Sequence, residues 1–157
     1  MTSILRFLQI FSLGTWVGSI IYMSFVVAPG AFSILSNPDS AGALVGYSLT
    51  RLHWIGIIGG AVFLLATLAL EKSIAALVRP AALLVILMLV LTAASQFGVR
   101  PRIDSLRMQM GSVAATPAGN PLRASFDRLH QYSVWLESAV LLSGLVAVFL
   151  TARQSTP

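Results

Sequence analysis

Two histidines and one glutamate are the side chains of this sequence best suited to chemistry. His130 and Glu137 lie seven residues apart, so a helix carries both on one face, with Ser133 between them. His53 lies in another apolar segment. Imidazole and carboxylate groups bind haem iron, copper or zinc, and they also bind and release protons. The chain has no cysteine, which excludes disulfides, thiolate metal sites and cysteine nucleophiles.

The segments that carry these residues are too apolar for a water-soluble protein. Of 157 residues, 57% are hydrophobic and only 10% are charged, whereas an ordinary soluble domain has about a quarter charged residues. Charge-free windows predict four membrane spans, at about residues 7–28, 52–70, 80–99 and 129–152. We therefore expect an all-α fold, a single-domain integral membrane four-helix bundle that covers residues 1–157.

Prolines and capping residues set the expected ends of these helices. Pro29 is expected to bend or end the first helix, because proline removes a helix hydrogen bond. Asp39 or Ser40 is suited to cap the second. A short amphipathic helical extension is expected around residues 103–110, between helices three and four, and Pro121 suits the first turn of helix four.

Four helices of alternating direction bring their polar residues toward one membrane face. We call it the loop face, because it carries the connections around residues 29–51 and 100–128. The opposite half of the spans is nearly pure hydrocarbon, which argues against a self-contained pore. We expect both histidines at matching depth and Glu137 close to the bilayer midplane. The predicted one-sided pocket consists of Tyr22, His53, Gln96, His130 and Glu137.

Glu137 is the one charge that lies inside a predicted span. It could handle protons or cations, or orient a histidine. Alternatively, it is a neutral side chain that pins helix packing through a hydrogen bond to Tyr22, Gln96 or Ser133. Glycines offer further packing faces at Gly14-x-x-x-Gly18 and at Gly56, Gly59 and Gly60.

The formal net charge of +5 comes from cations that flank the apolar runs, where they meet lipid headgroups. We therefore expect the lipid bilayer as a partner and no nucleic acid. The loop face has six arginines and the opposite side has four lysines and arginines. The first helix nevertheless has a cation before it, Arg6, and only an acidic residue, Asp39, after it. Because cationic flanks tend to stay in the cytoplasm, this difference favours cytoplasmic termini.

Several short motifs resemble the bacterial branch of the transmembrane protein 205-like family. The resemblance covers about residues 7–150 and implies a four-helix domain without established activity, in a bacterial inner membrane. The layout is also loosely similar to copper-resistance-D-type and haem-binding membrane domains. The motifs are Gly14-x-Trp16-x-Gly18-Ser19, Phe25-Val26-Val27-Ala28-Pro29-x-x-Phe32, Ala41-Gly42-Ala43-Leu44-Val45-Gly46 and Phe126-x-x-Leu129-His130.

No nucleophile–base pair, phosphate-binding loop or diagnostic metal motif is present in the sequence, so we expect no enzyme. The first hypothesis is an accessory or structural subunit of a larger membrane complex, redox or photosynthetic, with membrane-protein partners or as a homo-oligomer. The second is a carrier of haem, another tetrapyrrole, copper or zinc that uses His53 and His130, with Glu137 as a further ligand. The third is a proton-coupled transporter that uses Glu137.

Overall fold

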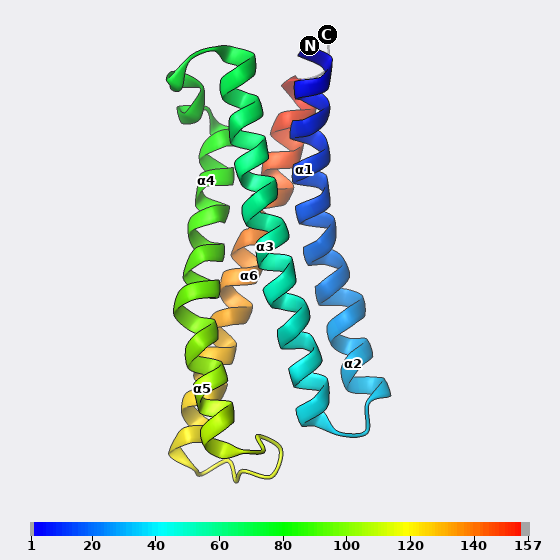
Figure 1. Ribbon diagram of the computed structural model, residues 1–157, viewed down its shortest axis with the longest axis vertical. Helices are drawn as coiled ribbons and strands as arrows, with labels where there is room; N and C mark the ends of the chain where they lie inside the picture. The colour runs from blue at the N-terminus through cyan, green and yellow to red at the C-terminus, as the bar shows by residue number, and fades with distance from the viewer. Residues whose placement is uncertain (1, 155–157) are drawn as a thin grey trace.

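The computed structural model describes residues 2–154, and these residues form helices joined by short connections, with no strand (Figure 1). Where two helical segments follow one another without a break, they form one long helix. The elements are α1 (Thr2–Tyr22), the π-helical η1 (Met23–Val27), α2 (Ala28–Ile34), α3 (Pro38–Glu71), the 3₁₀ turn η2 (Ile74–Val78), α4 (Pro80–Ala93), the π-helical η3 (Ala94–Val99), α5 (Arg100–Met110) and α6 (Pro121–Gln154).

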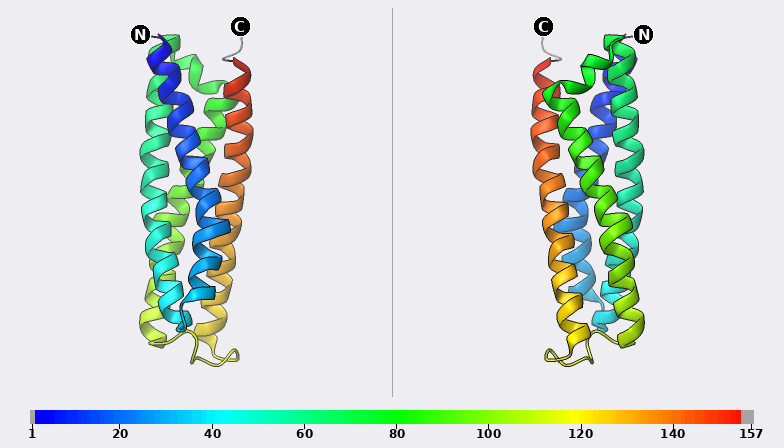
Figure 2. Two further views of the ribbon diagram at one scale, coloured as in Figure 1. Left: turned by 90° about the vertical axis from the view of Figure 1, so that its right-hand side faces the viewer. Right: turned by 90° about the vertical axis from the view of Figure 1, so that its left-hand side faces the viewer.

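The long helices form an antiparallel four-helix bundle. α1 packs against α3 and α6, and α4 packs against the same two helices, so α3 and α6 face each other across a diagonal (Figure 2). Both ends of the chain lie at the same end of the bundle as η2. Each long helix has between 31 and 34 residues and is apolar enough to cross a membrane. The expected all-α, four-span fold is thereby confirmed.

The first and third long helices continue through a proline, which corrects the expectation for Pro29. One π-helical segment ends two residues before Pro29, and another ends two residues before Pro101. In these segments Ala28 N–H donates to Met23 O and Arg100 N–H donates to Ser95 O, which are i to i−5 bonds. The wider turn takes up the proline ring, which otherwise clashes with the carbonyl four residues earlier. The first helix therefore runs on to Ile34.

On the loop face the helices extend well beyond the apolar windows. α3 begins at Pro38, and its N-cap is Asn37, which accepts from Asp39 N–H at 2.9 Å, instead of Asp39 or Ser40. α6 begins at Pro121, as expected for its first turn. The expected extension at 103–110 is the end of α5. The part of α3 between Arg51 and Glu71 is about 30 Å long, which equals the thickness of a bilayer's hydrocarbon core. We take these two residues as the edges of the apolar layer. The loop-face ends of the bundle therefore reach about 20 Å beyond the apolar layer.

The core is centred on Trp16, which is completely buried. Its indole lies against Gly56 and Gly60 of α3, where a side chain would overlap it. The other packing face that the sequence predicts, Gly14 and Gly18, has no atom within 4 Å of where a Cβ would stand. Gly56 and Gly60 therefore allow α3 to pack closely against α1, whereas Gly14 and Gly18 of α1 face outward.

Asp39 ties the start of α3 to the connection between α5 and α6. Its carboxylate accepts from Ser112 Oγ at 2.5 Å, from Val113 N–H at 2.9 Å and from Ala114 N–H at 3.3 Å. The Ser112 hydrogen bond, helped by the two backbone donors, lowers the pKa of Asp39. The ionised carboxylate therefore holds the loop in place.

This contact predicts a pH-dependent loop. Because the folded-state pKa of Asp39 is lowered, its stabilisation is present above the ordinary value of 3.8 and is lost as the pH falls through the lowered value. We expect Asp39→Ala to speed protease cleavage within residues 111–120 and to abolish the acid-induced increase seen in the parent chain. Asp127→Ala, an exposed carboxylate elsewhere, serves as control. Equal cleavage of both variants would contradict the clamp.

Candidate functional site

Three polar side chains from three helices meet in the interior of the bundle. His53 of α3 is fully buried and lies between Gln96 of η3 and Glu137 of α6. Its Nδ1 is 2.7 Å from Gln96 Oε1, and its Nε2 is 3.3 Å from Glu137 Oε2. The Glu137 side chain is 14% exposed. We call this group the His53 triad, and it spans the diagonal between α3 and α6.

The partners of His53 determine where its protons lie. An amide oxygen only accepts hydrogen bonds, so Nδ1–H donates to Gln96 Oε1. In the electrically neutral pair, one proton remains for Nε2 of His53 and Oε2 of Glu137. On Nε2 it makes an imidazolium–carboxylate ion pair, and on Oε2 it makes a neutral acid–imidazole hydrogen bond. Either arrangement has no net charge, as burial in an apolar interior favours.

Two buried polar atoms at this level have no hydrogen-bond partner within residues 2–154. One is Oε1 of Glu137, and the other is Nε1 of Trp16. The indole lies against Gly56, which is one turn from His53 along α3. Buried polar groups in folded proteins are nearly always hydrogen-bonded, so each unpaired one calls for an explanation. The free Oε1 offers a lone pair to one further proton or donor.

The triad lies near the edge of the apolar layer and not at its midplane. His53 follows Arg51 by two residues, which is about 3 Å along the helix. Glu137 precedes Arg153 by 16 residues, or about 24 Å. The sequence-based depth was wrong because it counted from Arg128, whereas α6 begins at Pro121 and keeps its first turns outside the apolar layer.

The other two residues of the predicted pocket lie elsewhere. His130 is exposed and stacks on Phe126, with ring centroids 6.2 Å apart. It is seven residues before Glu137 and thus about 10 Å nearer the loop face than the triad, so the expected matching depth of the histidines was wrong. Tyr22 is 60% exposed on the outer side of α1. The pocket therefore reduces to His53, Gln96 and Glu137.

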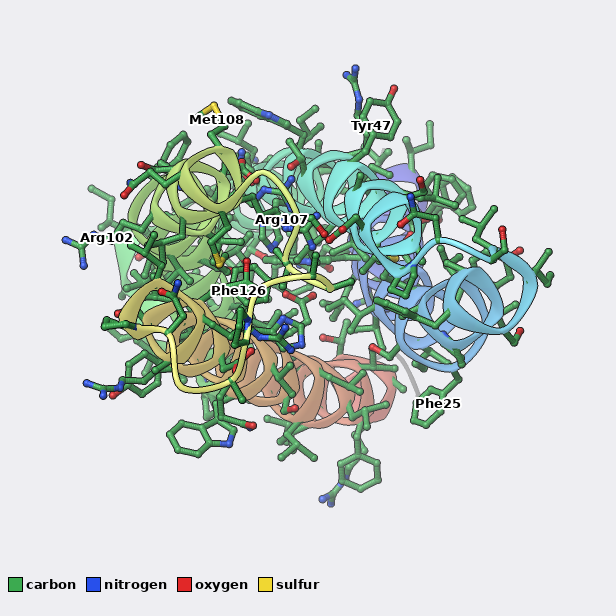
Figure 3. The ribbon with its side chains drawn as sticks, turned by 90° about the horizontal axis from the view of Figure 1, so that it is seen from below. Phe25, Tyr47, Arg102, Arg107, Met108 and Phe126 are labelled. Atoms are coloured by element: carbon green, nitrogen blue, oxygen red, sulfur yellow. The ribbon has the colours of Figure 1, made fainter. Side chains whose placement is uncertain are left out.

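Two arginines lie between the triad and the loop face. The guanidinium of Arg100 lies against Gly46, and that of Arg107 lies against Gly42. Figure 3 shows Arg107 directed inward beside Phe126, over whose ring it lies at 5.4 Å. Burial, and next the neighbouring Arg100, lower the pKa of Arg107. The Gly42-x-x-x-Gly46 spacing is the sequence signal that could have located these residues.

A few polar groups also occur near the opposite end of the bundle, where we expected nearly pure hydrocarbon. Gln9 Nε2 donates to Thr67 Oγ1 at 2.8 Å, and the Thr67 hydroxyl donates to Phe63 O. A pocket of about 260 Å³ opens beside them. It also contains Arg79, which pairs with Glu71 at 2.6 Å. Buried apolar side chains separate this pocket from the triad, namely Leu13, Phe63, Val85, Met88 and Val140.

The donor set does not fit a haem or metal ion held by both histidines. Both ring nitrogens of His53 already have hydrogen-bond partners, and a metal needs one of them with a free lone pair. Its proposed second ligand, His130, lies outside the bundle interior. Within residues 2–154, no group of three or more histidines, aspartates and glutamates has metal-binding geometry.

Comparisons with known proteins assign a family but no activity. A family model described as a domain of unknown function (DUF4149) matches residues 11–112. No curated protein and no solved structure matches the chain. The matched segment contains His53 and Gln96, whereas Glu137 follows it in α6. The match agrees with the expected domain without established activity, and the closer resemblance to the transmembrane protein 205-like family stays a prediction.

Proposed function

The chain belongs to the DUF4149 family of domains of unknown function, and from that premise we propose that it is a non-enzymatic, proton-coupled membrane transporter. In this proposal the His53 triad is the proton-binding site. The observation that carries it is the His53–Glu137 pair inside the bundle, with Nε2 and Oε2 3.3 Å apart and Glu137 Oε1 without a hydrogen-bond partner within residues 2–154.

The position of the pair supports this role. Imidazole is the side chain whose charge changes between about pH 5 and 8, and ionisable residues inside membrane spans are characteristic of proton relays. The guanidinium groups of Arg100 and Arg107 lie against α3 between the triad and the loop face. The apolar side chains around Phe63 and Met88 close the other side. A site that opens toward one face at a time is what alternating access requires.

The two other hypotheses receive less support. The haem or metal carrier would need His53 to give up a hydrogen bond and His130 to enter the bundle. The accessory or structural subunit, with membrane-protein partners or as a homo-oligomer in a redox or photosynthetic complex, stays a prediction. So do the bacterial inner membrane and the cytoplasmic termini.

The proton site can be tested without knowing the solute. We expect infrared difference spectra after a pH step to contain the C=O band of a protonated carboxylic acid from Glu137, and Glu137→Gln to remove it. Glutamine keeps the size and the hydrogen bond but cannot ionise. Proton flux into reconstituted vesicles should fall to the level of protein-free vesicles in the same variant.

Asp127→Asn provides the matched control, because Asp127 lies on the same helix but is 53% exposed and pairs with Arg123. It should keep both the Glu137 band and the proton flux. A Glu137→Gln protein that retains the band would contradict the proton site. One that loses the band but keeps the flux would contradict transport through it.

A further inference from the structure

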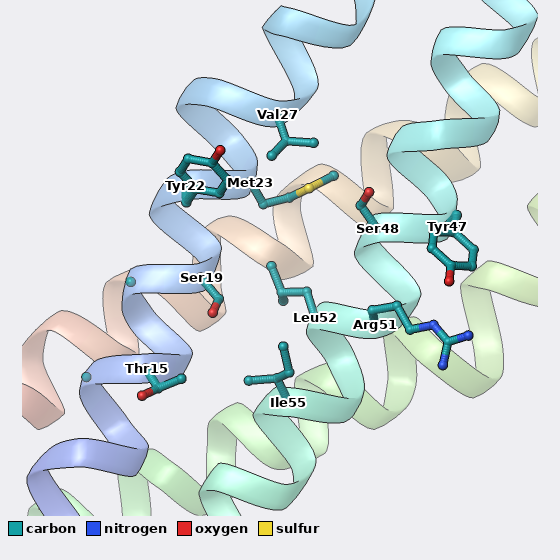
Figure 4. Close-up of a pocket in the computed structure, with 12 residues that line it drawn as sticks. Thr15, Ser19, Tyr22, Met23, Val27, Tyr47, Ser48, Arg51, Leu52 and Ile55 are labelled. Atoms are coloured by element: carbon teal, nitrogen blue, oxygen red, sulfur yellow. The ribbon is translucent and has the colours of Figure 1, made fainter.

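A groove on the membrane-facing side of the bundle runs between α1 with η1 and α3. Its volume is about 640 Å³. Figure 4 shows Ser19 and Met23 on one side of the groove and Leu52 and Ile55 on the other, with the Arg51 side chain on the outer side of α3 beside Tyr47. Gly14 and Gly18 also line it, and nothing in the described residues fills the space within 4 Å beside them. We call this the α1–α3 groove.

Arg51 gives the groove a cation without an acidic partner. The guanidinium lies over the Tyr47 ring at 5.1 Å, and no ion pair joins it to a carboxylate within residues 2–154. Other arginines of the chain do pair, such as Arg100 with Asp104 and Arg123 with Asp127. An exposed arginine next to an apolar groove complements an anion that carries an apolar tail.

The depth of the groove matches the position of a lipid's headgroup and the start of its tails. Arg51 marks the loop-face edge of the apolar layer, so its guanidinium lies at headgroup level. The hydroxyl of Ser19, on the α1 side of the groove, lies at the level of the glycerol backbone. Gly14 and Ile55 lie further into the apolar layer, where acyl chains run. The basic groups of the loop face favour a lipid with net negative charge.

We propose that the α1–α3 groove binds one anionic glycerophospholipid. Its phosphate accepts hydrogen bonds from the Arg51 guanidinium, and one acyl chain lies along the open face of Gly14 and Gly18. A guanidinium suits this role because it presents several donors in a plane that matches phosphate oxygens. The site is separate from the His53 triad and does not depend on the proposed proton site.

Native mass spectrometry of the full chain tests this proposal. The protein is released from nanodiscs of equal parts phosphatidylglycerol and phosphatidylcholine, and the bound lipids are counted. We expect one phosphatidylglycerol per chain. Arg51→Gln should lower its occupancy about fivefold, as expected for loss of one cation at an anionic lipid surface. Arg102→Gln, another exposed loop-face arginine, should retain the lipid, because Arg102 lies outside the groove.

A second variant tests the acyl-chain part of the site. Gly18→Leu places a side chain into the groove at a position where no atom of the described residues lies within 4 Å of its Cβ, so it should displace the lipid while the bundle stays folded. Equal lipid binding by the parent chain, Arg51→Gln and Gly18→Leu overturns the proposal. Displacement of the lipid by excess inorganic phosphate overturns it in favour of a free anion. A dimer that Gly18→Leu dissociates overturns it in favour of a second copy of the chain.

Discussion

Replacing Glu137 with alanine is expected to destabilise the bundle by about 3 kcal/mol. The change removes the partner of a fully buried imidazole nitrogen, and breaking a buried pair from one side costs roughly 3–5 kcal/mol. We take the lower end of that range because the contact is long, at 3.3 Å, and Glu137 is partly exposed. The measurement is the free energy of unfolding in mixed detergent micelles.

Two variants make the Glu137 result specific. Asp127→Ala removes an exposed carboxylate of the same helix, whose pair with Arg123 is worth less than about 1 kcal/mol. Glu137→Gln keeps a hydrogen-bonding group and should retain most of the stability while it abolishes proton binding. If Glu137→Ala were as stable as Asp127→Ala, His53 would have to gain another partner, and the triad would not be a structural unit.

Gly56→Ala is expected to destabilise the protein by about 2 kcal/mol. A methyl group at this position would overlap the indole of Trp16, which is completely buried and has no room to move away. Overpacking of a filled core typically costs about 1–3 kcal/mol. The same substitution also displaces the ring that lies one turn from His53, so we expect the His53 imidazole signals in ¹⁵N NMR to shift.

Gly18→Ala is the matched control, since both glycines are helical and the sequence gives them the same packing role. Gly18 has open space where its Cβ would stand. Its replacement should cost nothing and should add up to about 1 kcal/mol through better helix propensity. The two variants are therefore expected to change stability in opposite directions. A loss of stability in both would indicate that the Gly18 face is packed.

The sequence predicts the helices well because charged residues mark where apolar runs end. It does not predict how far the helices continue into water, as the starts of α3 at Pro38 and α6 at Pro121 show. A helix outside the membrane is held by caps and interhelical contacts, here the Asn37 cap and the Asp39 clamp. The clamp depends on a partner 73 residues away in the chain, and hydropathy detects neither the cap nor the clamp.

The candidate site was predicted in part. His53, Gln96 and Glu137 were among the five residues of the predicted pocket. They were chosen because polar side chains inside an apolar span need hydrogen-bond partners, and other polar side chains are the partners available there. The depth of His130 along the bundle axis was predicted wrongly. Counting from Arg128 put His130 in the pocket, and a difference of seven residues moves a side chain by about 10 Å. The sequence also does not predict that Gly56 and Gly60 pack inward whereas Gly14 and Gly18 do not, because both pairs have the same spacing.

The π-helical segment η3 links a proline outside the apolar layer to the chemistry inside it. A turn with i to i−5 bonds holds one more residue than an α-helical turn, so it rotates the residues on its two sides relative to each other. Gln96 lies within this segment, and Pro101 lies just beyond it. The direction of the Gln96 side-chain amide therefore depends on this irregular turn, and the tautomer of His53 depends on that direction. Pro101, five residues after Gln96, imposes the irregular turn.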